Sequence, residues 1–343
     1  MALTQVETSG LSGSGPSSNS TTGNVFSQVG PFKNRIINGA MAVDQRNAGA
    51  AQTITAGAAL AYTVDRWYAY CTGANVTGQR VAGSGSDQYR YRFTGAASVT
   101  AIGFAQRIEQ LNSYDLNGTT ATLSVDLANS LLTSVTWTAY YANTADTFGS
   151  LASPTRTQIA TGTFTVTSTV TRYSTQISIP AAATTGIEIV FTVGAQTSGT
   201  WTIGDIQLEA GAAATPFERV NYRQTLSSCQ RYYYRLRSTG ANNIFSSGGQ
   251  CYSVVGALAI IQFPVTLRSA PSSLEQSGTA GDYRVWSSTT SAVNLSAVPV
   301  FSATTTTSTA VVDCTVASGL TAGNSTELLS STSNAYLGWS AEL

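Results

Sequence analysis

The chain has 343 residues, which is enough for two domains or for one domain with extensions. Charged residues make up only 10% of it, and 17 basic residues balance 17 acidic ones, which excludes a global field that would attract nucleic acid or an anionic membrane. Histidine is absent, which excludes zinc sites of the usual spacing as well as Ser-His-Asp and Cys-His catalysis.

The first segment, residues 1–30, is predicted to be an extended low-complexity arm. Its stretch GLSGSGPSSNSTTGN has almost no apolar content and cannot bury enough surface to order itself. Two interpretations of this segment remain open: it is a flexible tail, or it is an arm that docks onto a partner through Val25 and Phe26. The start MALTQVETSG lacks the basic and apolar regions of a signal peptide. No apolar run reaches the roughly 18 residues of a membrane span, so we expect no membrane insertion.

Residues 31–220 alternate between apolar and polar residues with a period of two, which is typical of half-buried strands. Short turn sequences such as LNGTT separate these runs. The segment therefore predicts an antiparallel β-sandwich. One short helix is expected near FAQRIEQLN, where Phe104, Ile108 and Leu111 have helical spacing. The apolar residues that share faces of the predicted strands are Leu123, Val125, Leu127, Val135, Trp137, Ile187, Ile189, Phe191 and Val193.

The stretch WTIGDIQLEAG changes its phase halfway. Trp201 and Ile203 share one face, but Ile206 and Leu208 fall in the opposite phase. Gly204 at the break predicts a β-bulge that re-aims the residues after it. We expect this strand to close the sandwich and RIINGAMAVDQRN, with a turn at Asn38 and Gly39, to open it.

Residues 221–343 predict a second, smaller β-sandwich, because strand-like runs such as GALAIIQF and AVVDCTV continue to the end. Its first part combines arginines with tyrosines. Basic residues with aromatic rings suit single-stranded nucleic acid, but the balanced charge argues against that partner. Tyrosine and arginine are also enriched at interfaces. We expect a subunit or inter-domain contact here, with these anchors: Tyr232, Tyr233, Arg235 and Arg237.

The four cysteines, Cys71, Cys229, Cys251 and Cys314, lie far apart and form no CxxC motif. Buried free thiols are the favoured interpretation. The alternative is one disulfide, for example between Cys229 and Cys251.

The opening and closing strands together resemble the jelly-roll modules of many carbohydrate-binding domains. Over residues 32–343 the chain also resembles bacteriophage tail fibre and related tail-associated virion proteins, particularly of cyanophages. The segments that carry this resemblance are FKNRIINGAMAVDQRNAGA, YTVDRWYAYC, SYDLNGTTATLSVDLAN, WTIGDIQLEAGAAATPFERVNY, SSCQRYYYR and NAYLGWSAEL. The implied fold is all-β: a jelly-roll β-sandwich, then a smaller C-terminal β-sandwich, behind the arm.

The resemblance implies a non-enzymatic virion protein, made in the host cytoplasm, that attaches the particle to host surface glycans. It also implies a homotrimer whose arm contacts other virion proteins. A capsid decoration, cement or capsid fibre protein and a polysaccharide-degrading tailspike are the alternatives. No pair of acidic residues stands out as the two carboxylates of a glycosidase, so no enzyme is expected.

Aromatic residues are the ligand-binding candidates, because sugar rings stack on tryptophan and tyrosine. The alternative for each is a place in the core, which is favoured for Trp137 and Trp201. No cofactor is required, but jelly rolls of the resembled type often hold a structural calcium ion. Asp205 matches the acidic position of that closing strand, although no glutamate closely follows Asn38 and Gly39. The ligand-binding candidates are Trp67, Tyr68, Tyr140, Tyr283 and Trp286.

Overall fold

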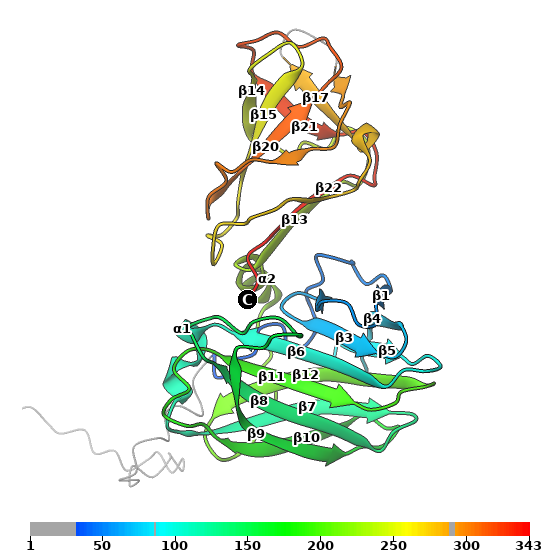
Figure 1. The fold of residues 1–343 in the computed structure, drawn as a ribbon, viewed down its shortest axis with the longest axis vertical. Helices are drawn as coiled ribbons and strands as arrows, with labels where there is room; N and C mark the ends of the chain where they lie inside the picture. The colour runs from blue at the N-terminus through cyan, green and yellow to red at the C-terminus, as the bar shows by residue number, and fades with distance from the viewer. Residues whose placement is uncertain (1–31, 86, 288–291) are drawn as a thin grey trace, which may run out of the picture.

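The structure, a computed structural model, describes residues 32–85, 87–287 and 292–343. These residues form strands with a few short helical segments, so the all-β prediction is confirmed. Figure 1 shows a large two-layered part with a smaller β-structured part above it. The arm predicted for residues 1–30 lies outside the described residues. Within the described ranges, no helix is long and apolar enough to cross a membrane.

The first layer of the large part is a six-stranded antiparallel sheet, here called sheet A. It lies on the side of the sandwich where the chain leaves for the C-terminal part. Its strands, in spatial order, are β1 (Gln52–Ile54), β4 (Val76–Ala82), β5 (Tyr89–Thr94), β12 (Thr200–Ala210), β7 (Thr120–Asn129) and β10 (Thr171–Ser178).

The second layer, sheet B, also has six antiparallel strands. The chain crosses repeatedly between the layers, as in a jelly roll, so that neighbours in a sheet are mostly distant in sequence. Its strands, in spatial order, are β2 (Ala61–Tyr62), β3 (Tyr68–Thr72), β6 (Ala101–Ile108), β11 (Ile187–Val193), β8 (Ser134–Ala142) and β9 (Arg156–Thr165).

One hydrophobic core fills the space between the two sheets, because the alternating apolar residues of both point inward. Trp137 and Trp201 are buried in it, as predicted. Aromatic rings at its centre stack in a chain, with Trp67 4.7 Å from Phe104 and Phe104 5.1 Å from Tyr91 between ring centroids. Such contacts add to the burial of apolar area.

The predicted bulge lies in β12. The register with β7 shifts between Gly204 and Gln207, and Asp205 adopts a positive φ of 43°. Because the extra residue restores the inward phase, Trp201 and Ile203 before the shift and Ile206 after it all face the core. The prediction from the broken alternation is confirmed.

The segment RIINGAMAV is not the strand that we expected. It is an irregular segment that follows β12 beyond the bulge: Arg35 N–H donates to Leu208 O at 2.8 Å, and Ile206 N–H donates to Gly39 O at 3.1 Å. A β-carbon on Gly39 would lie 2.1 Å from Ile206 O. The bulge turns β12 away from β5, so this segment, rather than a regular strand, satisfies the freed backbone groups.

The helix expected from Phe104, Ile108 and Leu111 is also largely wrong. Phe104 and Ile108 belong to β6, and only a short helix α1 (Gln110–Ser113) and a 3-10 turn η2 (Tyr114–Leu116) follow. Both apolar side chains face the core from the strand. Their spacing of four fits the strand period of two as well as the helical period, which explains the wrong assignment.

The C-terminal part has its own hydrophobic core, formed by residues between Phe245 and Ala341. Three small antiparallel sheets and the 3-10 turn η3 (Ala280–Asp282) surround it. The strands of these sheets, in spatial order, are β13 (Tyr233–Arg237), β22 (Tyr336–Ser340) and β16 (Glu275–Gln276); β14 (Gly248–Cys251), β15 (Gly256–Gln262), β20 (Thr309–Thr315) and β19 (Val300–Phe301); and β18 (Val293–Asn294), β17 (Tyr283–Ser287) and β21 (Thr326–Ser330).

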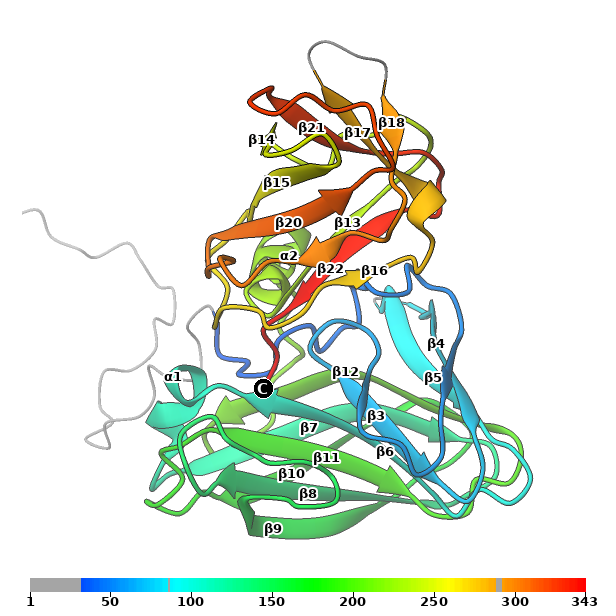
Figure 2. The ribbon, with the colours of Figure 1, turned by 45° about the horizontal axis from the view of Figure 1, so that its top comes forward.

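Residues 211–220 connect the two parts and lie across the outer face of sheet A. Thr215 N–H donates to Glu209 Oε1 at 2.9 Å, and Glu218 N–H donates to Gln207 Oε1 at 2.8 Å. Helix α2 (Tyr222–Gln230) then begins after Asn221, whose side chain accepts from Arg223 N–H as an N-cap. Figure 2 shows α2 between the sandwich and the C-terminal strands.

All four cysteines are buried free thiols. The favoured interpretation is therefore confirmed, and Cys229 is not joined to Cys251.

Candidate functional site

Four tyrosines share the outer face of sheet B, the face that points away from the core. Tyr62 on β2 pairs with Tyr68 on β3, and Tyr70 follows on the same side of β3. Tyr140 on β8 joins them in one cluster with the buried Ala105 and Val190. We call Tyr62, Tyr68, Tyr70 and Tyr140 the tyrosine face.

Tyr70 is a partly exposed member of this face and lies flat on the sheet. It pairs with Gly103 on β6, where an added β-carbon would come within 2.1 Å of Tyr70 Cζ. The ring therefore occupies the space that a side chain at position 103 would need. Burial raises the pKa of Tyr70, so its hydroxyl stays protonated at neutral pH.

A buried carboxylate, Glu188 on β11, holds the tyrosine face in place. Tyr68 Oη donates to Glu188 Oε1 at 2.6 Å, and Arg107 Nε donates to the same oxygen at 2.8 Å. Arg156 forms an ion pair with the other oxygen, and its guanidinium lies 4.1 Å from the centroid of Tyr140. Desolvation raises the pKa of Tyr68 to about 12. These bonds fix the rings before any ligand arrives.

Threonine hydroxyls surround the rings. Thr72 and Thr100 lie 2.7 Å apart between their Oγ1 atoms, and Thr138 and Thr161 lie 3.0 Å apart. A hydroxyl can both donate and accept a hydrogen bond. Partly exposed rings beside neutral hydroxyls can bind an extended, neutral and polar ligand that has apolar faces.

Of the predicted ligand residues, only Tyr140 is partly exposed on the tyrosine face. Tyr68 lies on the same face but is completely buried. Trp67 is also completely buried, because its ring stacks on Phe104 in the core and its Nε1 donates to Asn38 O at 3.1 Å. The rings of Trp67 and Tyr68 are therefore closed to a ligand, and the prediction for them is wrong.

Of the two ligand candidates in the C-terminal part, one is buried and the other is exposed. Tyr283 is completely buried, and its hydroxyl donates to Tyr336 O at 2.6 Å, so that prediction is wrong. Trp286 is 46% exposed on β17, opposite Glu327 on β21. Its strand β17 lies at the opposite end of the molecule from the strands of sheet B in both views (Figures 1 and 2).

The predicted interface anchors Tyr232 and Tyr233 are completely buried within the chain, between the sandwich and the C-terminal part. Tyr232 Oη donates to Glu109 Oε2 at 2.8 Å, and the Arg66 guanidinium lies 3.6 Å from the Tyr232 centroid. The Arg46 guanidinium lies 3.5 Å from the Tyr233 centroid. The interface that the tyrosines and arginines predicted is therefore an inter-domain contact. As subunit anchors, these tyrosines are wrong.

Arg235 and Arg237 complete the same contact. Arg235 Nη1 donates to Arg46 O at 2.7 Å, and Arg237 Nη2 donates to the same oxygen at 2.9 Å. Close by, Glu342 pairs with Arg66 and lies 3.5 Å from Arg46 Nη1. We call this set of contacts the junction.

The junction also borders the tyrosine face. Tyr62 Oη and Arg107 Nη1 donate to Leu343 O at 3.0 and 2.7 Å. The C-terminal segment therefore covers one end of the tyrosine face. Tyr70 and Tyr140 lie on the uncovered part.

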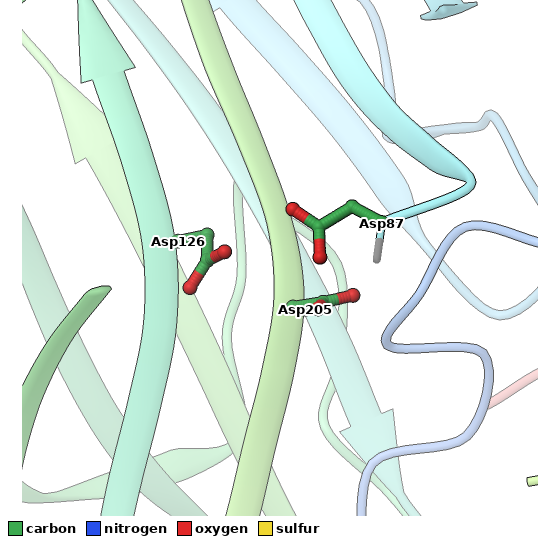
Figure 3. A group of neighbouring side chains, drawn as sticks. All are labelled: Asp87, Asp126 and Asp205. Atoms are coloured by element: carbon green, nitrogen blue, oxygen red, sulfur yellow. The ribbon is translucent and has the colours of Figure 1, made fainter. Parts of the chain in front are cut away.

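Asp205, the calcium candidate, lies in a cluster of three aspartates on the outer side of sheet A, together with Asp87 and Asp126 (Figure 3). Their ligand oxygens lie within 4.8 Å of one another. Three arginines surround the cluster: Arg219 Nη2 lies 2.6 Å from Asp87 Oδ1 and 2.5 Å from Asp205 Oδ2, Arg90 pairs with Asp87, and Arg172 Nη1 lies 3.1 Å from Asp126 Oδ1.

Burial, followed by the hydrogen bond with Asp87, raises the pKa of Asp205 to about 7. Desolvation alone would raise the pKa of Asp87 too, but hydrogen bonds from Asp205, Arg90 and Arg219 hold it below its usual value. A calcium ion needs several free carboxylate oxygens, whereas guanidinium groups occupy these. The donor set fits an ion-pair cluster and does not fit calcium.

A cavity of about 470 Å³ lies beside α2, between the irregular opening segment and α1. Leu111 and Val220 supply apolar lining, and Gln224 and Ser228 supply polar groups. Its arginines are paired, Arg35 with Asp115 and Arg231 with Glu109. Of the predicted residues it contains only Tyr232.

No protein-family model and no curated protein matches this chain. Several solved structures are similar. The enzymatically active domain of tailspike protein 4 of bacteriophage CBA120 is 17% identical, over 53% of this chain and 22% of that chain, with a TM-score of 0.34. A CBM4 structure is 18% identical, over 51% and 98%, with a TM-score of 0.33. The family 11 carbohydrate-binding module of Clostridium thermocellum, in complex with a β-1,3-1,4-mixed-linked tetrasaccharide, is 13% identical, over 49% and 100%, with a TM-score of 0.30.

Proposed function

We propose that this chain is a non-catalytic glycan-binding protein and that the tyrosine face holds the glycan. The observation that carries the proposal is the pair of partly exposed rings Tyr70 and Tyr140 on neighbouring parts of one sheet. Tyr70 lies on Gly103, and Tyr140 contacts Arg156 of the buried Glu188 cluster. Pyranose rings have apolar faces that suit flat aromatic side chains. Their hydroxyls suit the threonines around the rings.

The ligand of this face is a chain of neutral sugars rather than a small enclosed molecule. The rings lie on the open outer side of a sheet, where an extended polymer can pass. Glu188 is buried and paired with two arginines, so it is not offered as an acid or a base to the ligand. The site therefore holds a glycan without cleaving it.

The biological setting that we propose is a phage particle, on which this chain attaches the virion to glycans of the host surface. This setting rests on the resemblance of the sequence to tail fibre and tail-associated proteins. The glycan face lies on sheet B of the sandwich, and the C-terminal part borders one end of it through Leu343.

Binding of neutral polysaccharides to the full chain tests the proposal, by affinity electrophoresis and by calorimetry with defined oligosaccharides. We expect binding by the wild type, and a loss of at least about tenfold, or ~1.4 kcal/mol, in both Tyr70→Ala and Tyr140→Ala. Trp286→Ala is the matched control, since it removes an exposed aromatic ring elsewhere and is expected to bind as the wild type does.

Two results would contradict the proposal. If Trp286→Ala loses binding and the tyrosine variants do not, the glycan site lies in the C-terminal part. If the same incubations release reducing sugar, the protein is a polysaccharide-degrading enzyme instead.

A further inference from the structure

The edge strand β9 is the feature from which this inference starts. It is ten residues long and forms one end of sheet B, where β8 is its only partner among the described strands. The opposite end of that sheet, β2, has two residues, and β1 at the corresponding end of sheet A has three. Short edge strands resist pairing with other chains, whereas a long one invites it.

Charge does not protect this edge. From Thr157 to Thr171 the sequence contains no charged residue and no proline, although lysine and proline are the usual protection of exposed edges. A bulge does distort the first part, since the register with β8 shifts between Ala139 and Tyr140. From Thr161 to Thr165 the pairing is regular.

The backbone of this regular stretch has free hydrogen-bonding groups. Val166 N–H donates to Thr133 O, so the backbone groups of Val166 are directed toward the β8 side of the strand. Successive residues of an antiparallel strand direct their backbone groups alternately toward the two sides of the strand. The backbone groups of Gly162 and Phe164 are therefore also directed toward β8. Thr161, Thr163 and Thr165 then direct their N–H and C=O groups toward the open edge.

The side chains of the stretch are complementary to a second copy of themselves. In an antiparallel pair centred on Thr163, Thr161 meets Thr165 of the second copy, and threonine pairs across strands are favourable. Gly162 lies opposite Phe164 of the second copy, on the inner side, where Trp137 already covers Gly162 and the Phe164 ring packs into its own core. The threonines therefore carry the complementarity. Thr161 already forms one such threonine contact, with Thr138 at 3.0 Å.

We propose that β9 pairs with β9 of a second copy of this chain, in antiparallel register centred on Thr163, and forms a two-fold dimer with a continuous twelve-stranded sheet. A second copy is the occupant because the stretch is complementary to itself and needs no other sequence. The geometry leaves room for it: in both views β9 lies at the side of the sandwich away from the C-terminal part (Figures 1 and 2).

The dimer has a consequence that rests on the proposed function. Thr161 and Thr138 share the outer side of sheet B with Tyr140. The pairing therefore joins two tyrosine faces into one surface, and a polysaccharide can contact both. Two linked sites bind more tightly than one because the second contact is intramolecular.

The first experiment measures the mass of the full chain in solution at micromolar concentration by light scattering. We expect twice the mass of one chain for the wild type, and one chain for the double variant Thr161→Lys/Thr163→Lys. Thr53→Lys places a lysine on the short edge strand β1 and is expected to remain a dimer. A wild-type monomer, a trimer, or a double variant that stays a dimer would overturn the proposal.

A second experiment does not depend on the folding of the lysine variants. Thr163→Cys treated with a short bis-maleimide should yield a covalently linked dimer, because the two positions face each other at the centre of the pair. The four natural cysteines are buried, so the wild type serves as the background, and Thr53→Cys is the control on the other edge. Equal linking of Thr53→Cys and Thr163→Cys would overturn the register.

The two proposals fail separately. A dimer that binds no glycan contradicts the proposed function alone. A monomer that binds oligosaccharides through Tyr70 contradicts the dimer alone.

Discussion

The ring of Tyr70 lies directly on Gly103 of the neighbouring strand, where a β-carbon would come within 2.1 Å of Tyr70 Cζ. Gly103 has an ordinary strand conformation, so its φ angle is not what requires glycine. The absence of a side chain is what lets the ring lie flat. A single glycine thus sets the orientation of one of the partly exposed rings of the proposed site.

Gly103→Ala is therefore expected to weaken glycan binding while the fold is kept. The new methyl group displaces the Tyr70 ring, and we expect a loss of about tenfold in affinity, or ~1.4 kcal/mol, measured by calorimetry. Gly194→Ala is the matched control, since nothing lies within 4 Å of a β-carbon at that position. Equal affinity of Gly103→Ala and the wild type would contradict the role of the Tyr70 orientation.

Glu188→Gln is expected to lower the stability of the whole sandwich. The change leaves the buried Arg107 and the partly buried Arg156 without their carboxylate. Breaking a buried pair in this way costs about 3–5 kcal/mol. Chemical denaturation measures the free energy of unfolding. Asp115→Asn breaks the exposed pair with Arg35 and should cost at most about 1 kcal/mol. Similar losses in both variants would contradict the central role of Glu188.

Much of the fold could be predicted because strand periodicity is a local signal. The bulge after Gly204 could be read directly from the change of phase between Ile203 and Ile206. Helix α2 was missed, although Asn221 is a good N-cap. The arginines and tyrosines of this segment indicate an interface rather than a helix, and the helix is stabilised by contacts that are distant in sequence.

The site was harder to predict, because alternation shows which side chains share a face but not which face is covered. Tyr68 and Tyr70 have the same phase, yet Tyr68 is buried and Tyr70 is partly exposed. Tyr70 was missed although the same period of two would have indicated it. Trp67 has the opposite phase and enters the core. Coverage depends on residues as distant as Leu343, which sequence spacing cannot reveal.

The double variant Tyr233→Ala/Arg235→Ala is expected to loosen the junction between the two parts of one chain, not the assembly of subunits. It removes the ring under Arg46 and the bond to Arg46 O. We expect an earlier unfolding transition and a larger radius of gyration by small-angle X-ray scattering. The mass in solution should stay that of the wild type. If the variant instead loses mass in solution while the radius of gyration of each chain is unchanged, these residues form a contact between subunits.

Calcium is not expected to stabilise this protein. The carboxylates of Asp87, Asp126 and Asp205 are engaged by three arginines, and a divalent cation would have to displace these guanidinium groups. Melting temperatures in millimolar calcium and in excess EDTA should therefore agree. If calcium raises the melting temperature of the wild type but not that of Asp205→Asn, the ion displaces the arginines and the prediction is wrong.

The stability of the sandwich is expected to depend on pH through Asp205. Its pKa is raised to about 7 in the folded chain, against about 3.9 for an unperturbed aspartate in the unfolded chain. The folded chain thus holds this proton more tightly than the unfolded chain does. The contribution of Asp205 is fully present below about pH 4 and is lost as the pH rises toward 7.

Asp205→Asn is the variant that isolates this effect, since asparagine imitates the protonated side chain and cannot ionise. Every other titrating group is shared with the wild type, so the difference between the two free energies of unfolding reports on Asp205. In chemical denaturation from pH 4 to pH 8, the free energy of unfolding of the variant should increase relative to that of the wild type up to about pH 7. Above about pH 7 the difference between the two should stay constant. A difference that stays constant over this range would mean that the arginines hold Asp205 ionised throughout. The charged groups that face Asp205, and whose own variants would alter this profile, are Asp87, Arg90, Asp126, Arg172 and Arg219.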